Sequence, residues 1–151
     1  MFEKYSILFI QENCIQCHGC EVACKNWRNV ELGVNWRKVD TIWQGKYPDS
    51  KNVPIMMACR QCADPACAAA CPVGAIEKND AAGVVLVNRG KCIGCKVCFE
   101  ACPYDVPQFG VDGTMQKCDW CFHETNGNPI KPPCVTTCPT QALILLSEKG
   151  E

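Results

Sequence analysis

Residues 92–103 concentrate four thiols and form the most chemically informative segment of the chain. The cysteines are separated by two, two and three residues, and Pro103 follows the last. This spacing is typical of iron–sulfur proteins, in which thiolates hold [4Fe–4S] clusters and the fourth cysteine of such a run binds the neighbouring cluster. Gly94 has no Cβ and tolerates a positive φ, so the loop can approach a cluster closely. Pro103 offers no N–H and turns the chain away after the fourth ligand.

The same device occurs three more times, with spacings of two, two and three, of two, four and three, and of two, twelve and three residues. Three of the four runs end in Cys-Pro, and the first run, which ends in Cys-Lys, is the most divergent. Self-similar units at irregular intervals favour duplicated ferredoxin modules over a solenoid. The runs use all sixteen cysteines: Cys14, Cys17, Cys20 and Cys24; Cys59, Cys62, Cys67 and Cys71; Cys92, Cys95, Cys98 and Cys102; Cys118, Cys121, Cys134 and Cys138.

Three chemistries compete for these thiols. A disulfide framework suits an even count in a secreted chain, but we find no signal peptide, and Cys-x2-Cys pairs are poor disulfide geometry. Structural zinc uses cysteine pairs separated by a long loop, which fits the fourth run alone and not the other three. Cubane clusters take four thiolates each, so sixteen cysteines predict four [4Fe–4S] clusters with no thiol left over.

Exchange of the fourth ligand predicts how the runs pair. If neighbouring clusters swap their last cysteine, the second and third runs form an inner pair, and the first and fourth runs form an outer pair around it. The predicted ligand sets are Cys59, Cys62, Cys67 with Cys102; Cys92, Cys95, Cys98 with Cys71; Cys14, Cys17, Cys20 with Cys138; and Cys118, Cys121, Cys134 with Cys24.

Composition indicates that the clusters, rather than an aliphatic core, hold the fold together. The hydrophobic share of 48% includes the sixteen cysteines, and ten prolines and eleven glycines make the chain loop-rich. We therefore expect the metal-free protein to be largely unfolded. The net charge of −1 and the lack of a basic block argue against nucleic-acid binding. No apolar run reaches the ~18 residues of a membrane span, and no export motif is recognised.

Short elements must position the runs. Residues 5–10, 75–77, 84–87 and 142–146 are expected to form strands, and residues 20–28 and 66–70 short helices, with Pro65 in the first turn of the second. Residues 29–54 contain no cysteine and are expected to form an insertion with one or two strands, including residues 37–43, and a turn at 47–49. The predicted division is an outer ferredoxin-like module of residues 1–54 and 104–151, with an inner module of residues 55–103 inserted into it.

The remaining residues give no sign of catalysis. His18 and His123 are superfluous as ligands beside four cysteines per cluster. Trp120, between two cysteines, is expected to shield a cluster from water, while the other tryptophans, Trp27, Trp36 and Trp43, are expected to cover a cluster or a small core. Five cations flank ligands and either offset cluster charge or are solvated: Lys25, Arg28, Lys91, Lys96 and Lys117. No nucleophile–base pair or phosphate-binding loop is present, so the chain is not expected to be an enzyme by itself.

The order of the runs and several short sequence motifs in and between them resemble a known family over nearly the whole chain. The segments that carry the resemblance are GCEVACK at 19–25, NWR at 35–37, CRQCADPAC at 59–67, KCIGC at 91–95, ACPY at 101–104, PQ at 107–108 and KCDWC at 117–121. They resemble the iron–sulfur electron-transfer subunits of dimethyl sulfoxide reductase-type molybdenum and tungsten oxidoreductases, such as formate dehydrogenases, polysulfide reductases and aldehyde oxidoreductases.

The resemblance implies an α+β, double bacterial ferredoxin-like fold and a large catalytic subunit with a molybdenum– or tungsten–pterin cofactor as partner. A flavin/NAD- or quinone-linked redox subunit is a further expected partner, and a free-standing polyferredoxin shuttle is the alternative. Some relatives lack one ligand, whereas every ligand is present here. Membrane-attached relatives extend beyond the last cluster, which favours a soluble complex for this chain. The expected compartment is the cytoplasm, or the periplasm if a partner with an export signal carries the chain across.

Overall fold

The computed structural model describes residues 5–122 and 131–147, which form short helices and two-stranded sheets. No sheet in this described part of the chain has a third strand. The elements are β1 (Tyr5–Phe9), η1 (Gln11–Asn13), α1 (Gly19–Trp27), β2 (Arg37–Gln44), β3 (Lys51–Ala58), α2 (Ala66–Ala69), β4 (Ile76–Asn79), β5 (Val84–Val87), α3 (Val97–Ala101), β6 (Gln108–Phe109), β7 (Met115–Gln116), α4 (Pro133–Thr136) and β8 (Leu143–Ser147).

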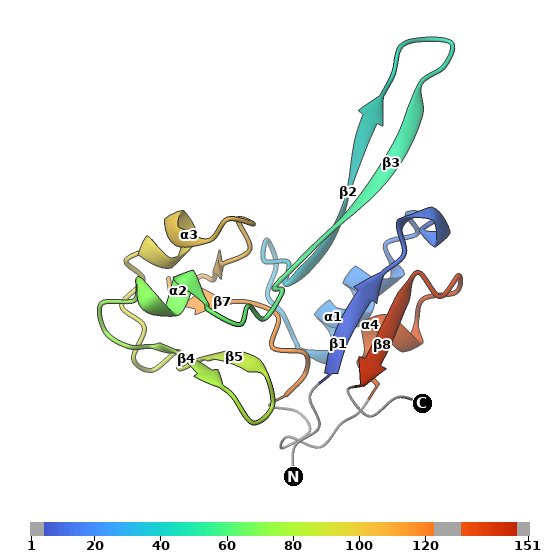
Figure 1. Ribbon diagram of the computed structural model, residues 1–151. Helices are drawn as coiled ribbons and strands as arrows, with labels where there is room; N and C mark the ends of the chain where they lie inside the picture. The colour runs from blue at the N-terminus through green and yellow to red at the C-terminus, as the bar shows by residue number, and fades with distance from the viewer. Residues whose placement is uncertain (1–4, 123–130, 148–151) are drawn as a thin grey trace.

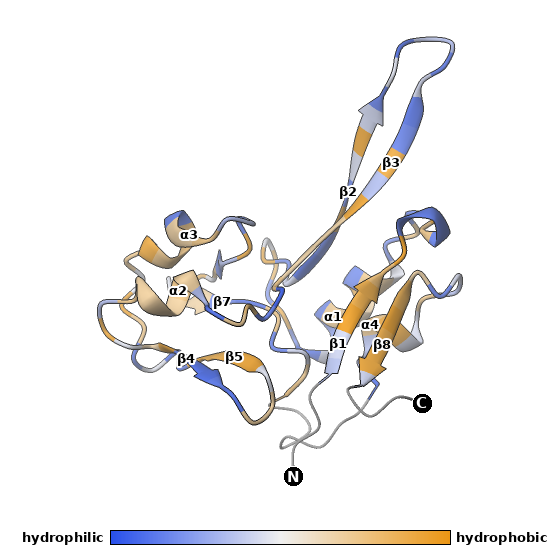
Figure 2. Ribbon diagram, viewed as in Figure 1, coloured by the Kyte–Doolittle hydropathy of each residue, from blue (hydrophilic) through white to orange (hydrophobic). Residues whose placement is uncertain are grey.

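An outer unit joins the two ends of the described chain. β1 pairs antiparallel with β8, with Phe9 opposite Leu143, and α1 packs against α4 behind this pair in the view of Figure 1. β1 alternates between exposed and more buried positions, whereas β8 runs from buried Leu143 to exposed Ser147, and both strands are largely apolar (Figure 2). A core of Val39, Val135 and Leu143 lies between these helices and strands, together with two cysteines. Aliphatic packing is therefore sparse and interleaved with thiols.

An inner unit is formed by the middle of the chain. β4 and β5 form a hairpin closed by the turn at residues 80–83, and α2 packs against α3. Ile76, Val85 and Cys98 form its core with Met115, which is fully buried. Met115 comes from β7, so residues that follow the third cysteine run pack on the inner unit.

The β2–β3 hairpin projects away from both units (Figure 1). Its eight register pairs run from Arg37 opposite Ala58 to Gln44 opposite Lys51. Near the base Arg37 and Val39 are buried, whereas Trp43 is 68% exposed towards the tip. Both strands of a two-stranded ribbon are edge strands, so β3 accommodates Pro54, which would interrupt a central strand.

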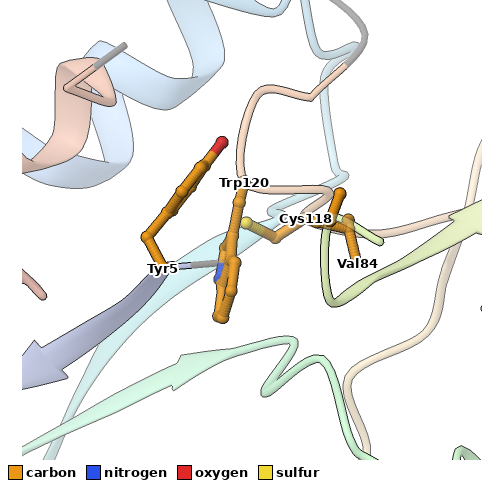
Figure 3. Close-up of a cluster of buried hydrophobic side chains, with 5 residues drawn as sticks. Tyr5, Val84, Cys118 and Trp120 are labelled. Carbon is orange, nitrogen blue, oxygen red and sulfur yellow. The ribbon is translucent and has the colours of Figure 1, made fainter. Parts of the chain in front are cut away.

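The two units meet at a small apolar cluster. Tyr5 stacks on Trp120 with ring centroids 5.8 Å apart, and Val84 and Cys118 complete the contact (Figure 3). Gln61 adds a polar bridge, because its Nε2 donates to the Cys118 carbonyl at 2.7 Å and its Oε1 accepts from the Val85 N–H at 2.8 Å.

The strands and helices expected from the sequence are present within two residues of their predicted ends. Pro65 differs in detail, since it is the residue before α2, with extended backbone (ψ 104°), and not part of the first helical turn. Five elements that the sequence did not suggest are present as well: η1, α3, β6, β7 and α4.

Candidate metal centres

Three cavities are each lined by four cysteine thiols, and each combines three cysteines of one run with the last cysteine of another. The sets are Cys14, Cys17, Cys20 and Cys138; Cys71, Cys92, Cys95 and Cys98; and Cys59, Cys62, Cys67 and Cys102. They are the same sets that ligand exchange predicts, so the structure brings these twelve thiols together as expected.

The remaining four thiols form a buried group at the junction of the units. Cys24, Cys118, Cys121 and Cys134 are all less than a tenth exposed. Burial raises the pKa of Cys24 to about 12, and the charges of the other three thiolates contribute to the rise. These electrostatic interactions, and the packing of α1, which carries Cys24, on α4, which carries Cys134, indicate that the four side chains lie near one another, as the predicted exchange requires.

The backbone adopts the left-handed conformation at one equivalent position in all four runs. The second residue between the first two cysteines has φ of 56° at Gln16, 51° at Gln61, 68° at Gly94 and 53° at Trp120. For a residue other than glycine this conformation costs roughly 1–2 kcal/mol. Strain of this kind persists where the surroundings fix the chain, and it gathers at ligand sites. The repetition therefore supports a shared ligand-binding loop.

The three Cys-Pro exits share a second geometry. The third residue after the cysteine has φ of 59° at Gly74, 50° at Asp105 and 53° at Gln141. In the second and fourth runs this turn aims a backbone N–H at the cysteine: Ala75 donates to Cys71 Sγ at 3.3 Å and Ala142 to Cys138 Sγ at 3.2 Å. Although burial acts in the opposite direction, the N–H groups around each sulfur lower the pKa of Cys71 and Cys138. Such donors stabilise a thiolate ligand.

Burial has the opposite result at the interior thiols. It raises the pKa of Cys20 and Cys98 to about 11 and that of Cys121 to about 12. These groups are neutral thiols at pH 7 unless a metal displaces the proton. Burying these thiols is understandable if metal binding supplies the free energy that deprotonates them, because iron–sulfur clusters bind thiolates.

Buried cations surround the fourth group of thiols. Arg28 pairs with Asp119 at 3.0 Å, and both side chains are less than a tenth exposed. Lys117 is 4% exposed and donates to the carbonyls of Val85 and Cys118 at 2.5 and 3.2 Å. Lys117 also lines the cavity of Cys59, Cys62, Cys67 and Cys102. For Arg28 and Lys117 the expectation of a role near cluster charge therefore agrees better with the structure than the alternative of solvated charge.

Sequence reasoning missed Arg37, which is 3% exposed at the start of β2. In the sequence this residue stands out only as part of the NWR segment. The signal that could have found it is the two-residue period of a strand, which places Arg37 on the same face as apolar Val39 and opposite Lys38. In the structure Arg37 and Val39 are buried and Lys38 is exposed.

The other residues singled out by sequence have ordinary roles. His18 bonds to Glu21 at 3.0 Å through Nδ1, and His123 lies outside the described residues. Lys25 donates to the Val34 carbonyl at 2.6 Å, whereas Lys91 and Lys96 are exposed. The tryptophans differ in exposure. Trp120 is buried as expected and Trp36 donates to Gln116, but Trp27 and Trp43 are exposed.

The donor sets fit [4Fe–4S] clusters better than single ions. In residues 5–122 and 131–147, which include all sixteen cysteines, no three His, Cys, Asp or Glu side chains are grouped tightly enough to hold one metal ion. Four thiols around a cavity suit a cluster of several metals, since its corners stand farther apart than the ligands of one zinc ion.

Comparisons with known proteins agree with this chemistry. Residues 53–148 match the family model of a 4Fe-4S dicluster domain, and residues 11–27 match a 4Fe-4S binding domain. The B subunit of the anaerobic dimethyl sulfoxide reductase of Haemophilus influenzae is 40% identical, over 93% of this chain and 73% of its own length. The chain belongs to the family of these iron–sulfur subunits. The formate dehydrogenase iron-sulfur subunit of Wolinella succinogenes is 38% identical over 89% of this iron–sulfur subunit and 76% of its own length.

These matches confirm the family resemblance and the [4Fe–4S] cofactor expected from the cysteine spacing. The relatives are named as subunits of oxidoreductases, which agrees with an iron–sulfur protein that works within a larger complex. No helix within the described ranges of this iron–sulfur subunit has the length and apolar character of a membrane span.

Proposed function

We propose that this subunit holds four [4Fe–4S] clusters and relays single electrons between a large molybdenum– or tungsten–pterin catalytic subunit and a second redox partner. The observation that carries the proposal is the arrangement of sixteen thiols as four groups of four, each completed by a cysteine from another run. When bound, a [4Fe–4S] cluster supplies one-electron transfer. The relatives named for dimethyl sulfoxide reductase and formate dehydrogenase support a catalytic partner of this class.

The chain's own residues hold the sites, limit water and set the local electrostatics. The Cys-Pro exits donate N–H groups to Cys71 and Cys138, and Met115 donates to Cys92 Sγ at 3.3 Å. Donors to sulfur are among the features that set cluster potential. Trp120, 8% exposed between Cys118 and Cys121, limits solvent access to the fourth group.

The proposed architecture is a double ferredoxin-like fold with one module inserted into the other. The pairing of β1 with β8 and the packing of α1 on α4 support an outer module of residues 1–54 and 104–151. The β4–β5 hairpin and the packing of α2 on α3 support an inner module of residues 55–103, on which residues of β7 also pack. We further propose a reducing, cytoplasmic compartment, because all sixteen cysteines must stay reduced until clusters occupy them.

Anaerobic purification of the native complex tests the function. We expect a brown protein with about sixteen iron atoms and as many acid-labile sulfides per chain, four for each of four clusters. It should co-elute in fixed stoichiometry with a large subunit that contains molybdenum or tungsten. A colourless, zinc-containing preparation would overturn the cluster assignment. A brown chain that elutes alone would instead favour a free-standing electron shuttle.

A further inference from the structure

Arg37 is the most buried arginine near the thiol groups, and no anion among the described residues pairs with it. Its side chain is 3% exposed, and its Nε has no hydrogen-bond partner. The ion pairs within the described ranges involve other cations, such as Arg28 with Asp119. A buried guanidinium without a counter-charge costs several kcal/mol, since such a charge loses its hydration.

The position of Arg37 places it between two thiol groups. Val39, two residues later on the same face of β2, packs with Cys20 and Cys134. Trp36, the preceding residue, packs against the cluster that contains Cys118. Arg37 therefore enters the interior where the cavity of Cys14, Cys17, Cys20 and Cys138 adjoins the group of Cys24, Cys118, Cys121 and Cys134.

The electrostatics agree with this placement. Arg37 interacts electrostatically with the side chains of four cysteines: Cys134, Cys118, Cys20 and Cys24. One of these cysteines belongs to the first cavity and three to the fourth group.

We propose that Arg37 is the fixed counter-charge of the outer pair of clusters, raising the reduction potentials of both. The inference rests on the proposed function, because a thiolate-ligated cluster is the anion that the guanidinium lacks. Such a cluster is net negative and gains one further negative charge on reduction. A cation held nearby favours the more negative form, and the low dielectric of the interior strengthens the effect. Guanidinium stays protonated at every physiological pH, so the charge is permanent.

Arg28 provides the contrast within the same region. Asp119 lies 3.0 Å from its Nη2, so the pair as a whole is close to neutral. The ion pairs of the described residues include none with Arg37, which acts through its full charge. The two arginines therefore differ in net electrostatic effect although both are buried.

The test is an EPR-monitored redox titration of the anaerobically purified full-length protein and three variants. Arg37→Met removes the charge at similar volume, Arg37→Lys retains it, and Arg89→Met removes an exposed charge that pairs with Asp112 at the surface. In Arg37→Met we expect the equilibrium constant for one-electron reduction of each outer cluster to fall at least tenfold. A tenfold fall corresponds to a reduction potential 59 mV lower. Arg37→Lys should stay near wild type, and Arg89→Met should leave all four potentials unchanged.

Unchanged potentials in Arg37→Met overturn the proposal, as does an equal fall in the lysine and methionine variants, since shape and not charge would then be responsible. If Arg37→Met does not take up its full iron, Arg37→Gln gives the second neutral variant. Loss of the outer clusters in both neutral variants with full iron in Arg37→Lys supports the proposal, and loss in all three overturns it. A wild-type protein without clusters contradicts the proposed function itself, which separates the two failures.

Discussion

Replacing Gly94 by alanine is expected to destabilise the third run much more than the same replacement at Gly74 destabilises the second. Both glycines have positive φ, of 68° and 59°. A Cβ on Gly94 would lie 2.6 Å from the carbonyl oxygen of Gly113, in the turn between β6 and β7. At Gly74 no atom lies within 4 Å of the added carbon. Comparing the two variants therefore separates the cost of the positive φ, which both share, from the cost of the close contact, which only Gly94→Ala has.

The equivalent residues of the other runs give the magnitude. Gln16, Gln61 and Trp120 adopt the φ of Gly94 with a side chain present, so the conformation itself is tolerated at a cost of roughly 1–2 kcal/mol. Displacing the Gly113 carbonyl adds an overpacking cost of roughly 1–3 kcal/mol. We expect a loss of about 2–5 kcal/mol for Gly94→Ala and about 1–2 kcal/mol for Gly74→Ala.

The measurement is the rate at which the visible absorbance of the clusters disappears in a fixed concentration of denaturant under anaerobic conditions. A rate is the appropriate quantity because a metal-containing protein does not unfold in two reversible states. If the additional 1–3 kcal/mol appears in the unfolding barrier, Gly94→Ala loses its clusters about 5 to 150 times faster than Gly74→Ala. Equal rates for the two variants would refute the reasoning, since they would show that the turn at 110–113 moves aside freely.

Four further predictions concern the sites directly. Cys102→Ser should alter the EPR signal of the cluster held by the second run, and Cys71→Ser that of the third; a loss confined to the variant's own run would contradict ligand exchange. Trp120→Ala should cost roughly 3–5 kcal/mol and accelerate cluster loss in the same denaturant assay, because it removes a buried ring; an unchanged rate would argue against its shielding role. Removal of iron with a chelator should abolish most secondary structure in circular dichroism, and a cooperative melt of the apoprotein would contradict this. Burial raises the pKa of Cys20 to about 11, and burial with neighbouring thiolates raises that of Cys24 to about 12, so at neutral pH these positions bind a proton unless a metal displaces it. Because clusters bind thiolates, filling the sites should release protons and become more favourable as the pH rises from about 7 to 9; this is measured by proton release in weakly buffered solution, and cluster uptake without pH dependence would oppose it.

Local sequence was sufficient to predict the structure wherever the chain contains residues with one strong structural or chemical preference. The cysteine spacing grouped thiols that the structure brings together, and the apolar runs at residues 5–10 and 84–87 correspond to β1 and β5. The αL positions were only partly visible, because Gly94 indicates a positive φ whereas Gln16 and Trp120 do not. Their conformation is imposed by the loop and not by their own propensity.

Other features depend on contacts that no single segment encodes. The burial of Arg37 and Lys117 could not be predicted from the sequence, because arginine and lysine side chains are almost always exposed. Only the surrounding thiols compensate for the cost of burying these two charges. β3 contains Pro54 and polar residues at its start, which weaken its strand signal, and pairing with β2 outweighs them. β6, β7 and α4 are too short for any periodicity to reveal them.

The nesting of the thiol groups has a consequence for biosynthesis. A ribosome releases the N-terminal run first, but the cavity of Cys14, Cys17 and Cys20 is closed by Cys138, which emerges near the end of the described chain. The two inner cavities need no thiol later than Cys102. The inner sites can therefore be loaded on a nascent chain, while Cys14, Cys17 and Cys20 must remain reduced and without their fourth ligand until Cys138 has been synthesised.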